Sequence, residues 1–421
     1  MTIRGSVIRP LRLVPPSSRL SSLRREEGGR SQETGEHDLG HRSPDSRKIH
    51  RLVPLLLEWF ARNARDLPWR RTLDPYGIWV SEIMLQQTQV KTVMPYWERW
   101  MRELPTARAL AAAAPDRALK LWEGLGYYTR ARNLQTAAQQ IVREHAAKFP
   151  TAFDDILALP GIGRYTAGAI ASIAFNQPAP ILDGNVIRVL TRLFNIGENP
   201  REKEANKRLW RLAQALVTAS ANSQFSIFNF QFSIPHLQIG GPCSALNQSL
   251  MELGALVCTP RQPRCADCPV RRHCKARKAS RVDALPNLAR RPPATARRFV
   301  AFLAQRNGAW LVQQRPARVI NAHLWEFPNI EVSPDASLAE AAFQLLGRKP
   351  RKLAPLVVVK HSITRYRISL EACLATTLGN VSAHEHARWL PLPELEHLSF
   401  TSAHRKVLVA LRRHQQSSRK A

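Results

Sequence analysis

Residues 159–168 read LPGIGRYTAG, and this stretch decides the fold of the first part of the chain. Gly161 and Gly163 stand one residue apart, between a helical pattern at 152–158 and another at 165–175. Glycines at such a turn let the backbone approach a ligand closely, and the free N–H groups at the start of the second helix can bind a phosphate. A Gly-x-Gly by itself is usually only a turn. Between two helices, it predicts a helical hairpin with a phosphate site.

Apolar residues on both sides of the hairpin recur with the 3.6-residue period of an α-helix. Leu52, Leu56 and Phe60, for example, fall on one face of a segment that begins at Ile49. Further amphipathic segments lie at 80–100, 107–113, 116–122, 130–147, 185–194 and 203–217. Short breaks marked by Pro or Gly separate most of them. We therefore predict an all-α domain over residues 49–282.

The composition bounds the partners of this protein. The chain of 421 residues is long enough for two or three domains, and 44% of its residues are hydrophobic, which excludes wholesale disorder. Lys and Arg number 62 against 32 Asp and Glu, a net charge of +30 that is spread over the whole chain. A polyanion, nucleic acid first, is the expected partner, and a merely soluble basic surface is the alternative. The sequence has no apolar run of about 20 residues and no secretory signal, so we expect no membrane span.

Four of the six cysteines lie in one short loop, at Cys258, Cys265, Cys268 and Cys274. This spacing is not a disulfide framework and indicates metal or cluster ligands in a reducing cytosol. Zinc sites usually pair two close Cys–Cys steps across a longer gap, whereas four thiolates in one compact loop suit a 4Fe–4S cluster. We expect one 4Fe–4S cluster, with zinc as the alternative. Basic side chains interleave with the cysteines and would present positive charge to phosphates, namely Arg261, Arg264, Arg271, Arg272 and Lys275.

Three further motifs complete the pattern of the helical part. They are WVSEIMLQQTQV at 79–90, LWEGLGYYTRARNL at 121–134 and PILDGNVIRVL at 180–190. With the hairpin and the cysteine loop, they resemble the helix-hairpin-helix DNA glycosylases, and among these the adenine DNA glycosylases of the MutY type. The resemblance covers residues 50–282 apart from 222–241. It implies a base-excision repair enzyme that hydrolyses the N-glycosidic bond of adenine mispaired with 8-oxoguanine or guanine in double-stranded DNA.

Breaking an N-glycosidic bond passes through an oxocarbenium-like transition state, which needs an acid for the purine and a carboxylate for the sugar. Glu82 lies in an apolar helical segment that would raise its pKa toward that of a general acid. Asp183 stands at the start of a helix, where its carboxylate could face a bound sugar. Taken singly, a solvated Glu and a helix N-cap Asp are the ordinary interpretations. The resemblance implies that Glu82 is the acid, Asp183 the stabilising carboxylate and Asn185 an assisting polar group.

The second helix of the hairpin carries Tyr165 at the position where bifunctional relatives have a lysine. A lysine attacks the sugar carbon and forms a Schiff base, which a phenol cannot do. We therefore expect a monofunctional glycosylase that leaves an abasic site.

Extrusion of the target nucleotide requires residues that fill the gap in the duplex. The resemblance assigns the wedge and the contacts to the opposite base to Gln87, Thr88, Leu125 and Tyr127. It assigns the wall of the adenine pocket to Arg65, Leu67 and Trp69. A helix stop with a core Trp is the structural alternative for the LPWR stretch at 67–70.

Residues 297–415 predict a smaller α+β domain. Strand patterns occupy 299–305, 310–315, 356–363 and 366–375, with helices at 337–346 and 402–413. This part resembles the MutT-like (Nudix) C-terminal domain of the same family, which reads 8-oxoguanine. The Glu-rich helix of true Nudix hydrolases is missing, because 332–350 offer only Asp335 and Glu340. The Phe-Ser-His recognition loop of the family corresponds to Ile363-Thr364-Arg365, where Thr364 keeps a hydroxyl but the aromatic ring and the His are absent.

The remaining segments are predicted from composition. Residues 1–48 form a disordered basic extension, which is either a transit-like targeting segment or a non-physiological extended start. Residues 222–241 form an uncharged, β-prone insertion, since no charged side chain occurs from Leu212 through Met251. Residues 283–296 are a Pro-rich linker and 416–421 a tail.

Two other functions remain open at this point. One is an endonuclease III-like glycosylase with another base specificity, which Tyr165 and the second domain disfavour. The other is a catalytically inactive iron–sulfur DNA-binding protein that keeps the hairpin and the charge. In each case we expect a monomer on double-stranded DNA, in the cytoplasm at the nucleoid, with organelle targeting by the N-terminus left open.

Overall fold

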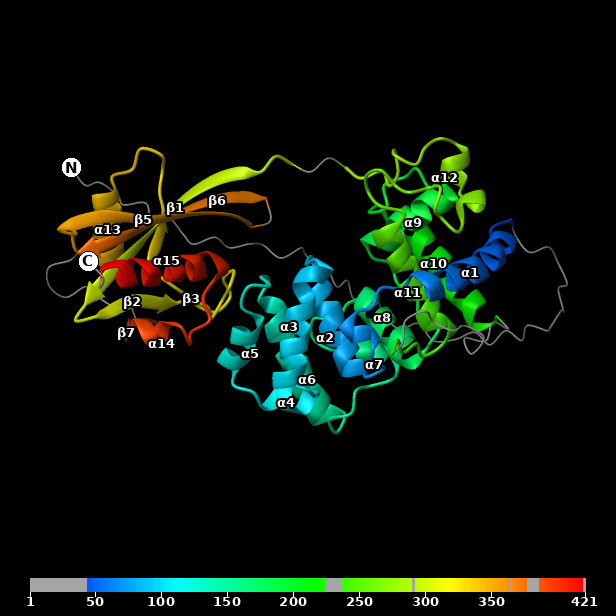
Figure 1. Cartoon of the computed structure of the whole chain (residues 1–421), viewed down its shortest axis with the longest axis horizontal. Helices are drawn as coiled ribbons and strands as arrows, with labels where there is room; N and C mark the ends of the chain where they lie inside the picture. Colours follow the sequence, from blue (N-terminus) through cyan, green and yellow to red (C-terminus); the bar gives the residue numbers. More distant parts are fainter. Residues whose placement is uncertain (1–43, 224–235, 290–291, 364, 377–385, 419–421) are drawn as a thin grey trace, which may run out of the picture. The chain divides into compact units, whose positions relative to one another are not determined.

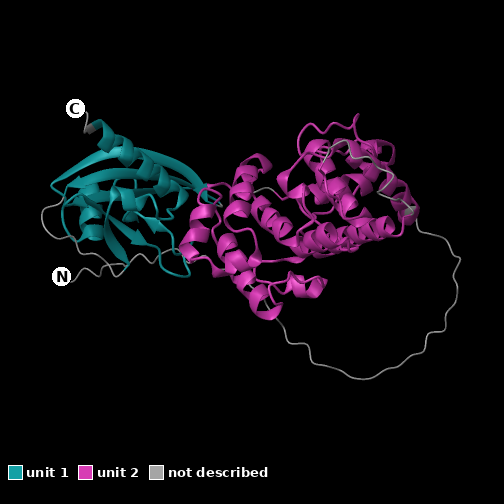
Figure 2. Ribbon diagram, turned by 60° about the horizontal axis from the view of Figure 1, so that its bottom comes forward, with its two compact units in different colours: residues 1–42, 296–421 teal, residues 43–295 magenta. Residues whose placement is uncertain are grey.

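The computed structural model describes residues 44–223, 236–289, 292–363, 365–376 and 386–418. The chain divides into two compact units, one spanning 43–295 and the other including 296–421 (Figure 2). The first is helical and the second is built on a sheet, which confirms the predicted two-domain fold.

The helical unit consists of a succession of helices, most of them joined by short loops (Figure 1). They are α1 (Pro44–Asn63), η1 (Pro68–Arg70), α2 (Pro75–Leu85), α3 (Val90–Glu103), α4 (Ala107–Ala112), α5 (Pro115–Trp122), α6 (Thr129–Glu144), α7 (Phe153–Leu157), α8 (Arg164–Phe175), α9 (Gly184–Phe194), α10 (Lys203–Ala221), α11 (Pro242–Leu256), η3 (Arg271–His273) and α12 (Lys275–Lys278). The predicted hairpin is present as α7 and α8.

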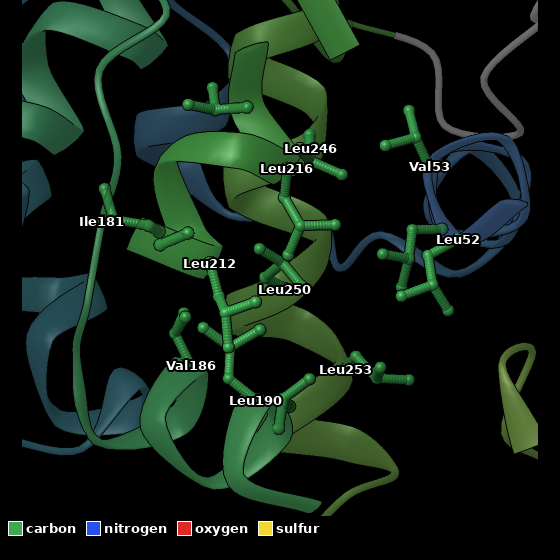
Figure 3. Packing of buried hydrophobic residues seen from close by; sticks show 14 of the residues in the cluster. Leu52, Val53, Ile181, Val186, Leu190, Leu212, Leu216, Leu246, Leu250 and Leu253 are labelled. Atoms are coloured by element: carbon green, nitrogen blue, oxygen red, sulfur yellow. The ribbon is translucent and has the colours of Figure 1, made fainter. Parts of the chain in front are cut away.

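One large core holds α1, α9, α10 and α11 together. Figure 3 shows leucines of these helices packed face to face, with Leu52 from α1, Leu190 from α9, Leu212 and Leu216 from α10, and Leu246, Leu250 and Leu253 from α11. The three leucines of α11 recur at i, i+4 and i+7, which places them on one face of the helix. This face fixes α11 and therefore positions the cysteine loop that follows it.

Two predicted boundaries of helices in this unit are wrong. The segment predicted as one helix at 80–100 is two helices, because the chain breaks at residues 86–89 and Gln87 has a left-handed φ of 57°. No Gly or Pro marks this break. Helix α1 begins at Pro44, so residues 44–48 belong to the helical unit and not to the predicted extension. The other residues of the extension lie outside the described residues.

The predicted insertion at 222–241 is shorter than its sequence pattern indicates. Residues 224–235 lie outside the described residues, but the part that follows them packs on the helical unit. Leu237 and Ile239 contact the core, and the Gln238 N–H donates to the carbonyl of Arg70 at 2.9 Å. Residues 236–241 are therefore integrated into the domain.

The predicted linker and tail are also shorter. Leu285 is buried, and Asn287 donates to the carbonyl of Gly197, so the start of segment 283–296 packs on the helical unit. The strand β1 already begins at Thr295. At the other end, α15 extends to Ser418 and includes the first half of the predicted 416–421 tail.

The second unit is a sheet with a helix on each face (Figure 1). Its elements are β1 (Thr295–Arg306), β2 (Ala309–Gln314), β3 (Trp325–Glu326), β4 (Asn329–Glu331), α13 (Leu338–Leu346), β5 (Lys352–Ile363), β6 (Tyr366–Thr376), β7 (Ala387–Pro391), α14 (Leu392–Leu395) and α15 (Ser402–Ser418). The strand order is β3-β2-β1-β6-β5, while β4 pairs with β1 and β7 with β2.

Strand β1 has apolar side chains on both faces, which explains why both faces of this sheet are covered. Phe302 packs in the cluster that includes α13, whereas its neighbour Leu303 packs in the cluster that includes α15. Successive side chains of a strand point to opposite faces, so β1 contributes to both cores. Among the described residues, no helix is long and apolar enough to cross a membrane.

Candidate active site

Glu82 is a buried carboxyl group in the middle of α2, with 5% of the residue exposed. Its Oε2 accepts a hydrogen bond of 2.7 Å from the hydroxyl of Tyr165, the second residue of the hairpin helix α8. The pKa of Glu82 is raised to about 7, chiefly by burial and also by the charge of Asp183, while the Tyr165 hydrogen bond and the charge of Arg70 act in the opposite direction. Near neutral pH, Glu82 can therefore hold a proton and release it, as a general acid must.

Tyr165 keeps its own proton. Burial, followed by the charges of Glu82 and Asp183, raises the pKa of this phenol well above its ordinary value. It acts as a neutral hydrogen-bond donor beside Glu82.

Asp183 is the N-cap of α9 and accepts a hydrogen bond of 2.8 Å from the N–H of Val186. Its other oxygen accepts from the amide of Asn185 at 2.8 Å. Both oxygens are thus held in place, and the ordinary N-cap interpretation is correct. The charge of Asp183 also acts on Glu82, so the cap lies close enough to serve the same site.

Arg188 connects this cap to the start of the cysteine loop. It donates to Oδ1 of Asn185 at 2.8 Å, to the carbonyl of Gly254 at 2.8 Å and to the carbonyl of Cys258 at 2.7 Å. A Cβ on Gly254 would lie 2.6 Å from Cβ of Asn185, so only glycine permits this approach of α11 to α9. Arg188 and the close packing of α11 on α9 therefore connect the cysteine loop to Asp183 and Asn185.

The predicted pocket wall is held by a buried carboxylate that sequence reasoning missed. Glu252 of α11 accepts a forked pair of hydrogen bonds of 2.8 Å from Arg65, and Arg70 also donates to both of its oxygens. Burial alone would raise the pKa of Glu252, but the two guanidinium groups lower it to about 2. Leu67 is buried, and Trp69 packs edge-on against Trp97, as the helix-stop alternative requires.

The two predicted wedge loops are tied together by one buried arginine, Arg130 of α6. Its guanidinium donates to the carbonyls of Ile83, Met84, Gln86, Leu125 and Gly126 and to the hydroxyl of Thr88. Burial lowers its pKa to about 10, so it stays charged at neutral pH. Of the predicted wedge residues, Leu125 is buried, whereas Tyr127 is 46% exposed with a left-handed φ of 45°.

The hairpin presents its glycines to solvent. Gly161 has a left-handed φ of 79°, and a Cβ there would lie 2.7 Å from Cβ of Asn133. Gly163 is the N-cap of α8, and a Cβ on it would meet nothing within 4 Å. The N–H groups at the start of α8 therefore lie at an open surface, as a phosphate site requires.

The four loop cysteines line one apolar cavity next to α9. The pKa of Cys268 is raised to about 12, chiefly by burial and also by the charges of the other three sulfurs. Among the described residues, no group of three or more Cys, His, Asp or Glu is arranged to hold one metal ion. Four sulfurs that line one cavity are a donor set that an iron–sulfur cluster can take, and its positive charge would stabilise the thiolates.

Sequence reasoning missed Arg130, Arg188 and Glu252. One signal could have found Glu252, since it is the first charged residue after a long uncharged stretch. The arginines carry no such signal, because basic residues are frequent in the chain. Thr364 lies outside the described residues.

Known families and proteins resemble this chain in both of its units. Residues 80–215 match the family described as HhH-GPD superfamily base excision DNA repair protein, and residues 299–410 match the NUDIX domain. The chain is 33% identical over 426 residues to an adenine DNA glycosylase of Rattus norvegicus, covering 86% of this chain and 78% of the relative. Over 417 residues it is 33% identical to the adenine DNA glycosylase of Homo sapiens, covering 84% and 72%. Among solved structures, a thermostable thymine-DNA glycosylase matches with a TM-score of 0.48 and 27% identity, over 56% of this chain and all of that one.

Proposed function

Because the chain belongs to the adenine DNA glycosylase family of base-excision repair, we propose that it removes adenine paired with 8-oxoguanine or guanine, without cleaving the DNA strand. Adenine DNA glycosylase activity follows from the family. The opposite base, the lack of lyase activity and the roles of single residues are the proposal.

The observation that carries the proposal is the pair formed by Glu82 and Tyr165. A carboxyl group with a pKa of about 7 can protonate the base of a flipped nucleotide, because a large share of it, about half, still holds its proton at neutral pH. Asp183 has the opposite task. Its two oxygens are fixed by Val186 and Asn185, so it can stabilise the positive charge on the sugar. The two carboxyl groups thus take separate roles in one reaction.

Tyr165 supports the monofunctional reaction. It occupies the hairpin helix where a lyase needs an amine, and its raised pKa leaves it a neutral phenol. Such a group cannot form an imine with the sugar. Hydrolysis should therefore end at an abasic site.

We assign the cysteine cavity to one 4Fe–4S cluster held by Cys258, Cys265, Cys268 and Cys274. A bound cluster would supply the positive charge that neutralises the thiolates. The chain's own contribution is Arg188, which links the loop to Asn185, and the basic residues around the loop, which suit DNA phosphates. The partner is double-stranded DNA, and the protein would act as a monomer wherever that DNA lies, at the nucleoid or in an organelle.

Two features support readout of 8-oxoguanine by the second domain, namely its NUDIX match and the β5–β6 hairpin. Ile363 pairs with Tyr366 at the end of this hairpin, so Arg365 lies at its tip. Arg365 is exposed and offers several donors to a purine edge.

A single-turnover assay tests the proposal. Duplexes carry adenine opposite 8-oxoguanine, guanine or thymine, and products are resolved with and without alkali. We expect strand breaks only after alkali, fastest opposite 8-oxoguanine, and no adduct on borohydride trapping. Breaks without alkali, or equal rates opposite all three bases, would refute it.

A further inference from the structure

The hydroxyl of Tyr165 has two acceptors in the site. It lies 2.7 Å from Oε2 of Glu82 and 3.4 Å from the sulfur of Met251, which is part of α11. A phenol has one hydrogen, so it can donate to only one acceptor at a time. The sulfur of Met251 therefore competes with Glu82 for the same hydrogen.

The outcome of this competition depends on the charge of Glu82. When Glu82 is ionised, its carboxylate takes the Tyr165 hydrogen, because a charge-assisted hydrogen bond is roughly twice as strong as a neutral one. When Glu82 is protonated, its own O–H can donate to the Tyr165 oxygen. The Tyr165 hydrogen is then free to point at the weak sulfur acceptor.

We propose that Met251 is a positioning residue that favours the acid form of Glu82 by accepting the Tyr165 hydrogen in that form alone. The inference rests on the proposed role of Glu82 as general acid. Its sign follows from the geometry, since an acceptor that is used only in the protonated state must stabilise that state. Met251 forms its hydrogen bond with Tyr165 and not with Glu82, so its effect on Glu82 is indirect.

The other charged groups around Glu82 come from separate elements and do not depend on Met251. Asp183 at the start of α9 raises the pKa of Glu82, and Arg70 of η1 lowers it. Arg70 is held by Glu252, the neighbour of Met251 in α11. A variant at 251 must therefore leave the pair of Arg70 and Glu252 in place, which favours substitutions of similar size.

Two variants change the acceptor with little change in volume. Met251→Leu removes it, and we expect the pKa of Glu82 to fall by about half a pH unit, as the loss of a weak hydrogen bond implies. Met251→Gln places an amide oxygen at a similar reach, and the pKa should equal or exceed that of the wild type. Met84→Leu removes a buried methionine from the same helix as Glu82 and should leave the pKa unchanged.

The pKa is measured on the free, cluster-containing protein from the carboxyl ¹³C resonance of Glu82, assigned by its absence from Glu82→Gln. A second measurement follows the alkaline limb of kcat/KM for adenine excision, which reports the same free-enzyme group. In a Tyr165→Phe background, Met251→Leu should have no further effect on the resonance, because the shared hydrogen is gone.

An unchanged pKa in Met251→Leu overturns the inference, as do equal shifts in Met251→Leu and Met251→Gln or a shift that persists with Tyr165→Phe. The resonance also separates the inference about Met251 from the proposed function, because it is measured without catalysis. If the expected shifts occur but no excision is detected at any pH, the inference stands and the proposed function fails.

Discussion

Arg192 donates a hydrogen bond of 3.3 Å from Nη1 to the sulfur of Cys258, although 66 positions separate the two residues. The same guanidinium donates to the carbonyls of Thr259, Val282 and Leu285, and Arg192 is only 1% exposed. One buried cation thus joins the first predicted cluster ligand to the segment that leaves the helical unit.

Arg192→Met should therefore weaken the cysteine loop. It removes a buried cation and leaves several carbonyl groups without a donor, which is typically worth about 3 kcal/mol or more. We expect loss of most of the iron and a lower melting temperature, measured by metal analysis and thermal unfolding. Arg211→Met, an exposed position on α10, is the control. Full iron content in Arg192→Met would show that this contact is dispensable.

The raised pKa of Glu82 makes stability depend on pH. Between the ordinary value of 4.5 and about 7, the folded protein keeps a proton that the unfolded chain has lost. The free energy of unfolding should therefore fall as the pH rises through this window, by up to about 3 kcal/mol. Glu82→Gln removes this dependence, so its stability advantage over the wild type should grow from pH 5 to pH 8 in urea unfolding. A constant difference would mean that Glu82 is not protonated in the folded protein.

Because Arg130 holds the two loops at 86–88 and 125–127, we expect its loss to disturb both loops together. Arg130→Gln removes most of the donors that hold the loop carbonyls, so both loops should lose their fixed geometry. We expect slower base flipping, seen with 2-aminopurine fluorescence in duplex DNA, and an excision rate at least about tenfold lower. Arg132→Gln, two residues along the same helix, is the control. Equal behaviour of the two variants would contradict the role given to Arg130.

Two deletions test which part of the predicted insertion at 222–241 the helical domain needs. Deleting 224–235 removes uncharged, aromatic residues and should improve solubility without loss of excision. Deleting 222–241 also removes Gln238, which bonds to Arg70, and should lower stability and activity. Activity and melting temperature of the two proteins are compared with the wild type. A loss of activity in the shorter deletion would show that residues 224–235 belong to the working domain.

The parts that the sequence predicted correctly depend on local patterns. The α7–α8 hairpin follows from Gly161, Gly163 and the helical period around them. Glu82 was predicted to be buried because its neighbours in α2 are apolar, and burial is what raises its pKa.

The structural features that could not be predicted from the sequence depend on contacts between residues far apart in the chain. Glu252 meets Arg65 across 187 positions, and no local pattern announces such a pair. Likewise, the strands β3, β4 and β7 are too short for a visible alternation and exist through pairing with β1 and β2. The break at Gln87 lacks the Gly or Pro that usually marks one. The roles of the individual site residues stay predictions.

The central claim is that Glu82 is the acid for adenine excision. Its most direct test is single-turnover excision by Glu82→Gln on a duplex with adenine opposite 8-oxoguanine, beside a binding titration of the same duplex. Loss of a general acid typically costs about 10²–10⁴ in rate, so we expect excision near background with DNA affinity nearly unchanged. A variant that keeps a tenth of the wild-type rate would contradict the account.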